Sequence, residues 1–144
     1  MPTNEISEVV FGRGHANIKA THPSTLEFTK DAHVSKNGDC ILVVSMDKGL
    51  ADLSGEFRDA LRRQGAKLTV LIEADVFSEE VHAHGSLHLS LSDPVEMVIR
   101  KSDFTSNRTL AVHADKAAAD LSRALVAKLQ NPEQKVKITL TVCL

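Results

Sequence analysis

The chain contains nearly the same eight residues twice, as DKGLADLS from Asp47 and as DKAAADLS from Asp115. The copies lie 68 positions apart, whereas related positions upstream of them lie 71 apart. The difference of three residues corresponds to a short deletion around residues 35–39. Self-similarity at a fixed period indicates a tandem duplication, and we expect repeats at about 5–75 and 76–144. The identical pairs include Leu42 and Leu110, Val44 and Val112, Lys48 and Lys116, Asp52 and Asp120, Gly14 and Gly85, Pro23 and Pro94, and Lys30 and Lys101.

Each half has the same pattern of apolar residues. Alternation with period two predicts a strand bent at glycine, over 8–21 in the first half and 81–92 in the second. A second strand (26–28 and 96–100) and a short buried strand (40–44 and 109–112) follow. Three-to-four spacing then predicts a helix, and a last strand, clearest at 136–142, closes each half. The residues on the helix faces are Leu50, Leu53, Phe57 and Leu61, and Ala118, Leu121, Leu125 and Leu129.

The fold class expected from this pattern is α+β and predominantly β. One half of about 70 residues would be a marginal domain alone. We therefore expect the chain 1–144 to form a single domain in which the two repeats share one core about a pseudo-twofold axis. The pattern leaves open a sandwich or a closed barrel, with two helices packed outside.

Composition limits the classes of partner. With 144 residues, a net charge of −2, no Trp, no Tyr and five Phe, the chain lacks the basic excess and the aromatic platforms typical of nucleic-acid binding. No apolar stretch reaches the ~20 residues that a membrane span needs, and the N-terminus has no signal-peptide pattern. Cys40 and Cys143 have no metal or redox spacing, which favours a reducing cytoplasm. A homo-oligomer remains open.

The repeated Asp-Lys pair is the first candidate site. Asp47 and Asp115 directly precede the expected helices, so we predict that they are N-caps. Lys48 and Lys116 would then lie at helix N-termini, which favour anions. The structural alternative is that each lysine pairs with an aspartate one turn later, Asp52 or Asp120.

Histidines form the second candidate site. His82 and His84 lie on one face of an expected strand, and His88 shares their parity. Three imidazoles could bind zinc, but the alternative is an exposed polar face, and neither a cysteine nor another ligand supports a metal. We therefore predict no bound transition metal and no cofactor.

Further candidates occur in only one half. Arg13 and His15 lie in GRGH, which lacks the phosphate-loop pattern and leads into a strand. His113 precedes the second Asp-Lys pair and could act as a general base near neutral pH. The charged stretch RKSDFTSNR, residues 100–108, is typical of a solvated loop, and the alternative is that it lines a site.

Several blocks carry a family resemblance: ATHPSTLEFTK from Ala20, GDCILVV from Gly38, MDKGLADLSGEFRDALRRQGAK from Met46, LSDPVEMVIRKSDF from Leu91 and ADKAAADL from Ala114. In these the chain resembles an archaeal family classified as domain of unknown function number 371. The resemblance implies an intracellular archaeal protein rich in β structure. It implies no activity and no catalytic residues.

Two functions follow from the residues. The first is a small-molecule binding protein or enzyme for an anionic metabolite, with its site between the repeats at the helix N-termini. That site would use the Asp-Lys pairs together with Arg13, His15 and His113. The second is a non-enzymatic module that binds a protein or RNA through the edges of its sheets.

Overall fold

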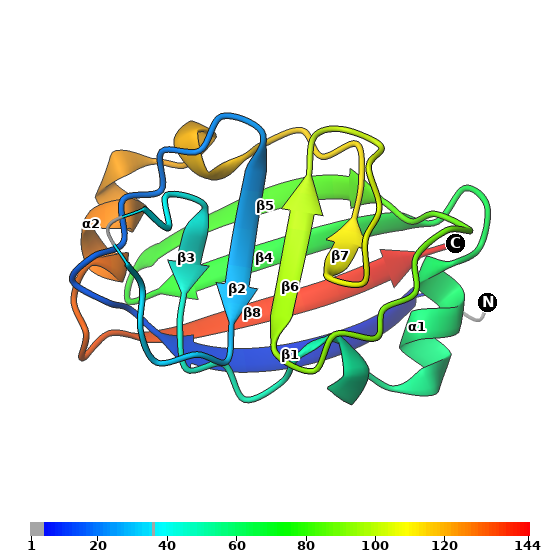
Figure 1. Ribbon diagram of the computed structural model, residues 1–144, viewed down its shortest axis with the longest axis horizontal. Coiled ribbons are helices and arrows are strands. Elements are labelled where there is room, and N and C mark those ends of the chain that lie inside the picture. Colours follow the sequence, from blue (N-terminus) through cyan, green and yellow to red (C-terminus); the bar gives the residue numbers. More distant parts are fainter. Residues whose placement is uncertain (1–4, 36) are drawn as a thin grey trace.

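The computed structural model describes residues 5–35 and 37–144, and its strands form two four-stranded sheets (Figure 1). The strands are β1 (Glu5–Arg13), β2 (Thr25–Thr29), β3 (Ile41–Val43), β4 (Lys67–Ala74), β5 (Phe77–His84), β6 (Glu96–Arg100), β7 (Thr109–Ala111) and β8 (Lys135–Cys143). The α-helices are α1 (Gly55–Leu61) and α2 (Arg123–Leu129), and 3-10 turns precede them at Leu50–Asp52 and Ala118–Asp120. The predicted α+β class, dominated by strands, is confirmed.

The two halves of the chain alternate within the first sheet. Its order is β1-β8-β4-β5 and all its pairs are antiparallel. The second sheet has the order β3-β2-β6-β7, with a central antiparallel pair and parallel outer pairs. In the described residues no continuous ladder joins the two sheets, and their edges meet at the isolated bridges Arg13–Val44 and His84–Val112. The closed-barrel alternative is therefore wrong.

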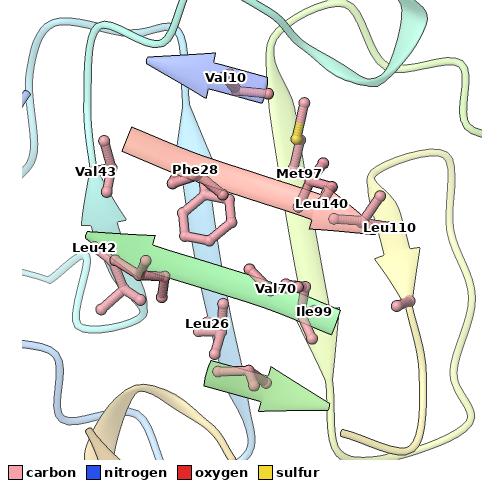
Figure 2. Packing of buried hydrophobic residues seen from close by; sticks show 14 of the residues in the cluster. Val10, Leu26, Phe28, Leu42, Val43, Val70, Met97, Ile99, Leu110 and Leu140 are labelled. Carbon is pink, nitrogen blue, oxygen red and sulfur yellow. The ribbon is translucent and has the colours of Figure 1, made fainter. Parts of the chain in front are cut away.

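One hydrophobic core fills the space between the sheets (Figure 2). Side chains alternate along each strand, so β4 and β8 bury every second residue, including Val70 and Leu140. From the second sheet, Leu26 and Phe28 point toward them and are fully buried. Both sheets therefore depend on the same core for their stability.

The helices lie at opposite ends of the two-sheet core (Figure 1). Each has only seven residues, and within the part of the chain described here neither is long and apolar enough to cross a bilayer. Their apolar faces, including Phe57 and Leu125, belong to the core. They begin later than predicted, because Leu53 and Leu121 are extended and end the 3-10 turns that precede them.

Both predicted bent strands end at their glycines instead. β1 stops at Arg13 and β5 at His84, and the following loops run against the last turns of the helices. A Cβ on Gly14 would collide with the Leu129 carbonyl oxygen, and one on Gly85 with the Leu61 carbonyl oxygen. The next residues donate N–H groups to these helix-end carbonyls, which would otherwise lack partners. The glycines therefore allow close packing against a helix end.

Candidate functional site

The aspartates of the repeated motif bind edge strands. Asp47 Oδ1 accepts the Phe11 N–H of β1 at 3.0 Å, and Asp115 Oδ1 accepts the His82 N–H of β5 at 2.9 Å. The prediction that they are helix N-caps is wrong. The chain leaving β3 or β7 crosses to the neighbouring edge strand before it turns into the helix, and Ser54 holds the N-cap position of α1.

The lysines of the motif pair with glutamates on the same edge strands. Lys48 Nζ lies 3.0 Å from Glu8 on β1, and Lys116 Nζ lies 3.3 Å from Glu79 on β5. Lys116 also donates to the backbone carbonyl of Glu80 at 2.9 Å.

The predicted pairing of these lysines with aspartates one turn later is therefore wrong. Asp52 instead binds Lys30 at 2.6 Å, and Asp120 binds Lys101 at 2.7 Å. The four-residue spacing has no significance here because the segment is not yet α-helical.

Each of these glutamates also holds the start of a helix. Glu8 accepts the Ser54 N–H at 2.6 Å, and Glu79 accepts the Ser122 N–H at 2.7 Å. Burial opposes ionisation of Glu8, but hydrogen bonds from Ser54 and Lys48 outweigh it and lower the pKa of Glu8. The motif thus links an edge strand, a lysine and a helix start.

The two Asp-Lys pairs lie far apart. They sit at β1 and β5, which are opposite edges of the first sheet with β8 and β4 between them. Three strand spacings separate those edges by about 14 Å. The geometry therefore does not bring the two pairs into one site at the helix N-termini.

A cleft lies beside the first pair, at the edge of β1. It has a volume of about 450 Å³ and is lined by Phe11, Gly12, Arg13, Ser45, Asp47 and Lys135, and we call it the Arg13 cleft. Ser45 adopts a left-handed backbone conformation with φ 52°, which is uncommon for residues other than glycine. Two sequence candidates, Arg13 and Asp47, therefore line one concave surface.

Two cations lie side by side in this cleft. Arg13 of β1 and Lys135 of β8 are direct partners in the antiparallel ladder, and both are exposed on the outer face. Like charges placed directly opposite are unfavourable. No ion pair with a carboxylate is found for either residue within 5–35 and 37–144. An anion bound between them would relieve the repulsion.

The other candidates are dispersed. His15 lies in the loop after Gly14, where Nδ1 accepts the Asn17 N–H and the ring meets His33 edge-to-face. His113 lies in the second half, with its ring centroid 6.3 Å from that of His84.

The predicted row of three histidines is incomplete. His82 and His84 are exposed on β5, as expected, but His88 lies in the following loop. Over the described residues, no three His, Cys, Asp or Glu side chains are arranged to hold a metal ion.

A buried carboxyl pair is the feature that sequence reasoning missed. Glu27 of β2 is only 7% exposed and shares a hydrogen bond with Glu96 of β6. Arg108 Nη1 lies 2.9 Å from Glu96 and 4.0 Å from Glu27, and Cys40 Sγ lies 3.8 Å from Glu27 Oε1. One exposed cation, Arg108, thus faces two carboxyl groups, of which Glu27 is buried and Glu96 is partly exposed.

Burial dominates the titration of this cluster. Burial, with the hydrogen bond to Glu96 and the repulsion of its charge, raises the pKa of Glu27 to about 8. Burial and the nearby carboxylates Glu27 and Asp39 raise the pKa of the Cys40 thiol to about 11. Cys40 is therefore not an activated thiol. A signal did exist in the sequence, since Glu27 is a charged residue inside a short apolar strand.

Residues 10–143 match the family described as "Domain of unknown function (DUF371)". The chain belongs to this family. The DUF371 protein described here is also similar to the uncharacterized protein MJ0206 of Methanocaldococcus jannaschii, an archaeon. The two are 37% identical over 128 residues, which cover 89% of this chain and 94% of that protein. The family resemblance expected from the sequence blocks is confirmed.

Proposed function

We propose that this DUF371 protein binds a small anionic molecule in the Arg13 cleft. The observation that carries the proposal is the pair of exposed cations, Arg13 and Lys135, at directly opposite ladder positions in a concave surface. Volumes of roughly 300–1,000 Å³ are typical of small-molecule sites, and the cleft falls within that range. The proposal keeps the ligand class expected from the sequence and sets the site at the β1–β8 pair, where Arg13 of the first half meets Lys135 of the second.

The lysines of the repeated motif contribute less to this proposal than the sequence suggested. Lys48 and Lys116 each have a carboxylate partner on their own edge strand. A ligand would have to displace those partners, whereas Arg13 and Lys135 need no such exchange. The anion site is therefore better placed at the ladder pair than at the helix starts.

The alternative function, an interaction module that binds through sheet edges, has weaker support. Strand addition needs unpaired backbone groups along an edge. Asp47 and Asp115 already accept edge N–H groups, and Lys116 covers the Glu80 carbonyl. These side chains make both edges of the first sheet poor templates for another strand.

Tandem duplication about a pseudo-twofold axis is part of the same proposal. The 71-residue offset relates Glu27 to Val98, which are Cα partners in the β2–β6 ladder. The 68-residue offset relates Leu71 to Thr139, which are partners in the β4–β8 ladder. A residue that pairs with its own equivalent lies on a twofold axis, and both sheets contain such a pair. We also place the protein in the cytoplasm, supported by free Cys40 and Cys143.

The test measures phosphate binding by isothermal titration calorimetry. We expect the wild-type protein to bind inorganic phosphate weakly, and Arg13→Ala and Lys135→Ala each to reduce the affinity at least fivefold. Higher ionic strength should weaken binding, because the contact is between exposed charges.

Lys67→Ala is the matched control. Lys67 pairs with His84 in the β4–β5 ladder, as Lys135 pairs with Arg13 in the β1–β8 ladder. The control removes the same charge from the same sheet face and should keep the affinity. Equal losses in Lys67→Ala and Lys135→Ala would show only a general charge effect and would contradict the site.

A further inference from the structure

We propose that the ligand of the Arg13 cleft is a nucleoside monophosphate, an inference that rests on the proposed function. Its phosphate would lie between Arg13 and Lys135, its base would stack on Phe11, and its sugar would face Asp47. The identification comes from the spacing of these groups within one cleft.

Phe11 supplies an aromatic surface whose distance from Arg13 suits the base of a nucleotide. Its side chain is 51% exposed and lines the cleft. It lies two residues before Arg13 on β1, so the two side chains share one face and their Cα atoms are about 7 Å apart. A five-carbon sugar separates a phosphate from a base by a similar distance. Bases stack on exposed aromatic rings whatever their identity.

Asp47 makes a bare polyanion a poorer ligand than a sugar phosphate. Its Oδ1 accepts the Phe11 N–H, and within the described residues no further partner is found for Oδ2. This oxygen is an acceptor without a proton to donate. A ribose hydroxyl would satisfy it, whereas a second phosphate at the same place would be repelled.

The size of the cleft favours one nucleotide. Its volume of about 450 Å³ lies toward the lower end for small-molecule sites. The net charge of −2 and the five phenylalanines of the whole chain argue against a long nucleic-acid track. A single nucleotide unit is therefore the occupant that we infer.

The chain has no Trp and no Tyr, so Phe11→Trp gives a single fluorescent reporter in the cleft. We expect adenosine monophosphate to quench this tryptophan. In the wild-type protein, calorimetry should give an affinity for adenosine monophosphate at least tenfold higher than for ribose 5-phosphate. Phe11→Ala should remove that difference. Phe104→Ala, which removes another exposed ring, is the control and should keep the difference.

The outcomes separate this inference from the proposed function. Equal wild-type affinities for the two phosphates would overturn the nucleotide while leaving the anion site intact. An unchanged preference in Phe11→Ala, with a melting temperature like that of the wild type, would also overturn it. Failure of both phosphates and of inorganic phosphate to bind would remove the anion site as well. A single-stranded tetranucleotide bound at least tenfold more tightly than the monophosphate would assign the cleft to nucleic acid instead.

Discussion

Burial and a neighbouring carboxyl group both raise the pKa of a carboxyl group. Glu27 is in this position beside Glu96, and Arg108 alone cannot balance two negative charges there. Arg100 lies near the same cluster, and burial and the charge of Arg108 lower the pKa of its guanidinium. The stability of the second sheet should therefore depend on whether the Glu27 carboxyl group is protonated.

The first prediction is a pH-dependent loss of stability that depends on Glu27. Its pKa is raised from 4.5 to about 8 on folding. The contribution of protonated Glu27 to the free energy of unfolding is fully present below pH 4.5. It is lost as the pH rises through 8, because the unfolded chain releases this proton at a lower pH than the folded protein does. Since one pKa unit is worth about 1.4 kcal/mol, the free energy of unfolding should fall by about 2–4 kcal/mol between pH 5 and pH 9 relative to Glu27→Gln.

Urea denaturation of both proteins at pH 5, 7 and 9 measures this difference. Glu80→Gln, which neutralises an exposed glutamate, is the control and should follow the wild-type profile. Parallel profiles for wild type and Glu27→Gln would mean that Glu27 is ionised in the folded protein at neutral pH.

At the residue scale, the sequence identified some important positions but not their partners. Asp47 and Asp115 stood out because both halves of the sequence contain the same short motif, yet their hydrogen bonds reach strands 36 and 33 residues earlier in the chain. Local spacing suggested a nearby N-cap instead. Glu27 was visible as a charged residue inside a short apolar strand, but its surroundings come from Cys40 and Arg108, which lie 13 or more residues away in the chain.

At the element scale, the repeated motif protects the edges of the first sheet. Unpaired N–H and C=O groups on edge strands are templates for aggregation. On β5, Asp115 accepts the His82 N–H and Lys116 covers the Glu80 carbonyl. Side chains thus satisfy backbone groups that a neighbouring strand would satisfy elsewhere.

The second prediction concerns Asp115→Ala. The change leaves the His82 N–H without its acceptor, and a hydrogen bond to a charged group contributes about 1.5–3 kcal/mol. The site is exposed, so water replaces part of this contribution, and we expect a loss of about 1 kcal/mol measured by urea denaturation. Light scattering during heating should also show earlier aggregation. Asp103→Ala, which removes an exposed carboxylate from a loop, should change neither quantity, and a similar effect in both variants would argue against edge protection.

The order of elements was predictable, but several boundaries were not. Apolar periodicity placed a helix after the short buried strand in each half, and α1 and α2 are there. It also extended each helix backwards, because a three-residue spacing such as Leu50 to Leu53 fits a 3-10 turn as well as an α-helix. Likewise, alternation continued past Gly14 and Gly85 although the ladders end there.

At the scale of the whole molecule, neither half can build the first sheet alone. Its order takes β1 and β4 from the first half, and β8 and β5 from the second, in alternation. Within this sheet, each described strand of one half pairs only with strands of the other half. Sequence periodicity could predict a shared core but not this alternation, because strand order depends on long-range pairing.

The third prediction follows from that alternation. Polypeptides 1–75 and 76–144, expressed separately, should each lack the far-ultraviolet circular dichroism of the intact protein. Mixing them should restore the β signal and give a one-to-one complex by size-exclusion chromatography with light scattering. A folded monomer of either polypeptide would show that the halves are independent domains.

The pairing of the first strand, β1, with the last, β8, has a consequence for where the backbone can be cut. Glu5 of β1 is the ladder partner of Cys143 of β8, so the two ends of the sheet-forming chain run side by side. β4 and β5 are joined across Asp75 and Val76, and Val76 is 84% exposed. A circular permutant that begins at Val76 and joins the old ends through a short linker would keep every strand pair. Because Glu5 and Cys143 lie side by side, the break in the chain can be moved from there to the β4–β5 hairpin while the order of strands in the sheet stays the same.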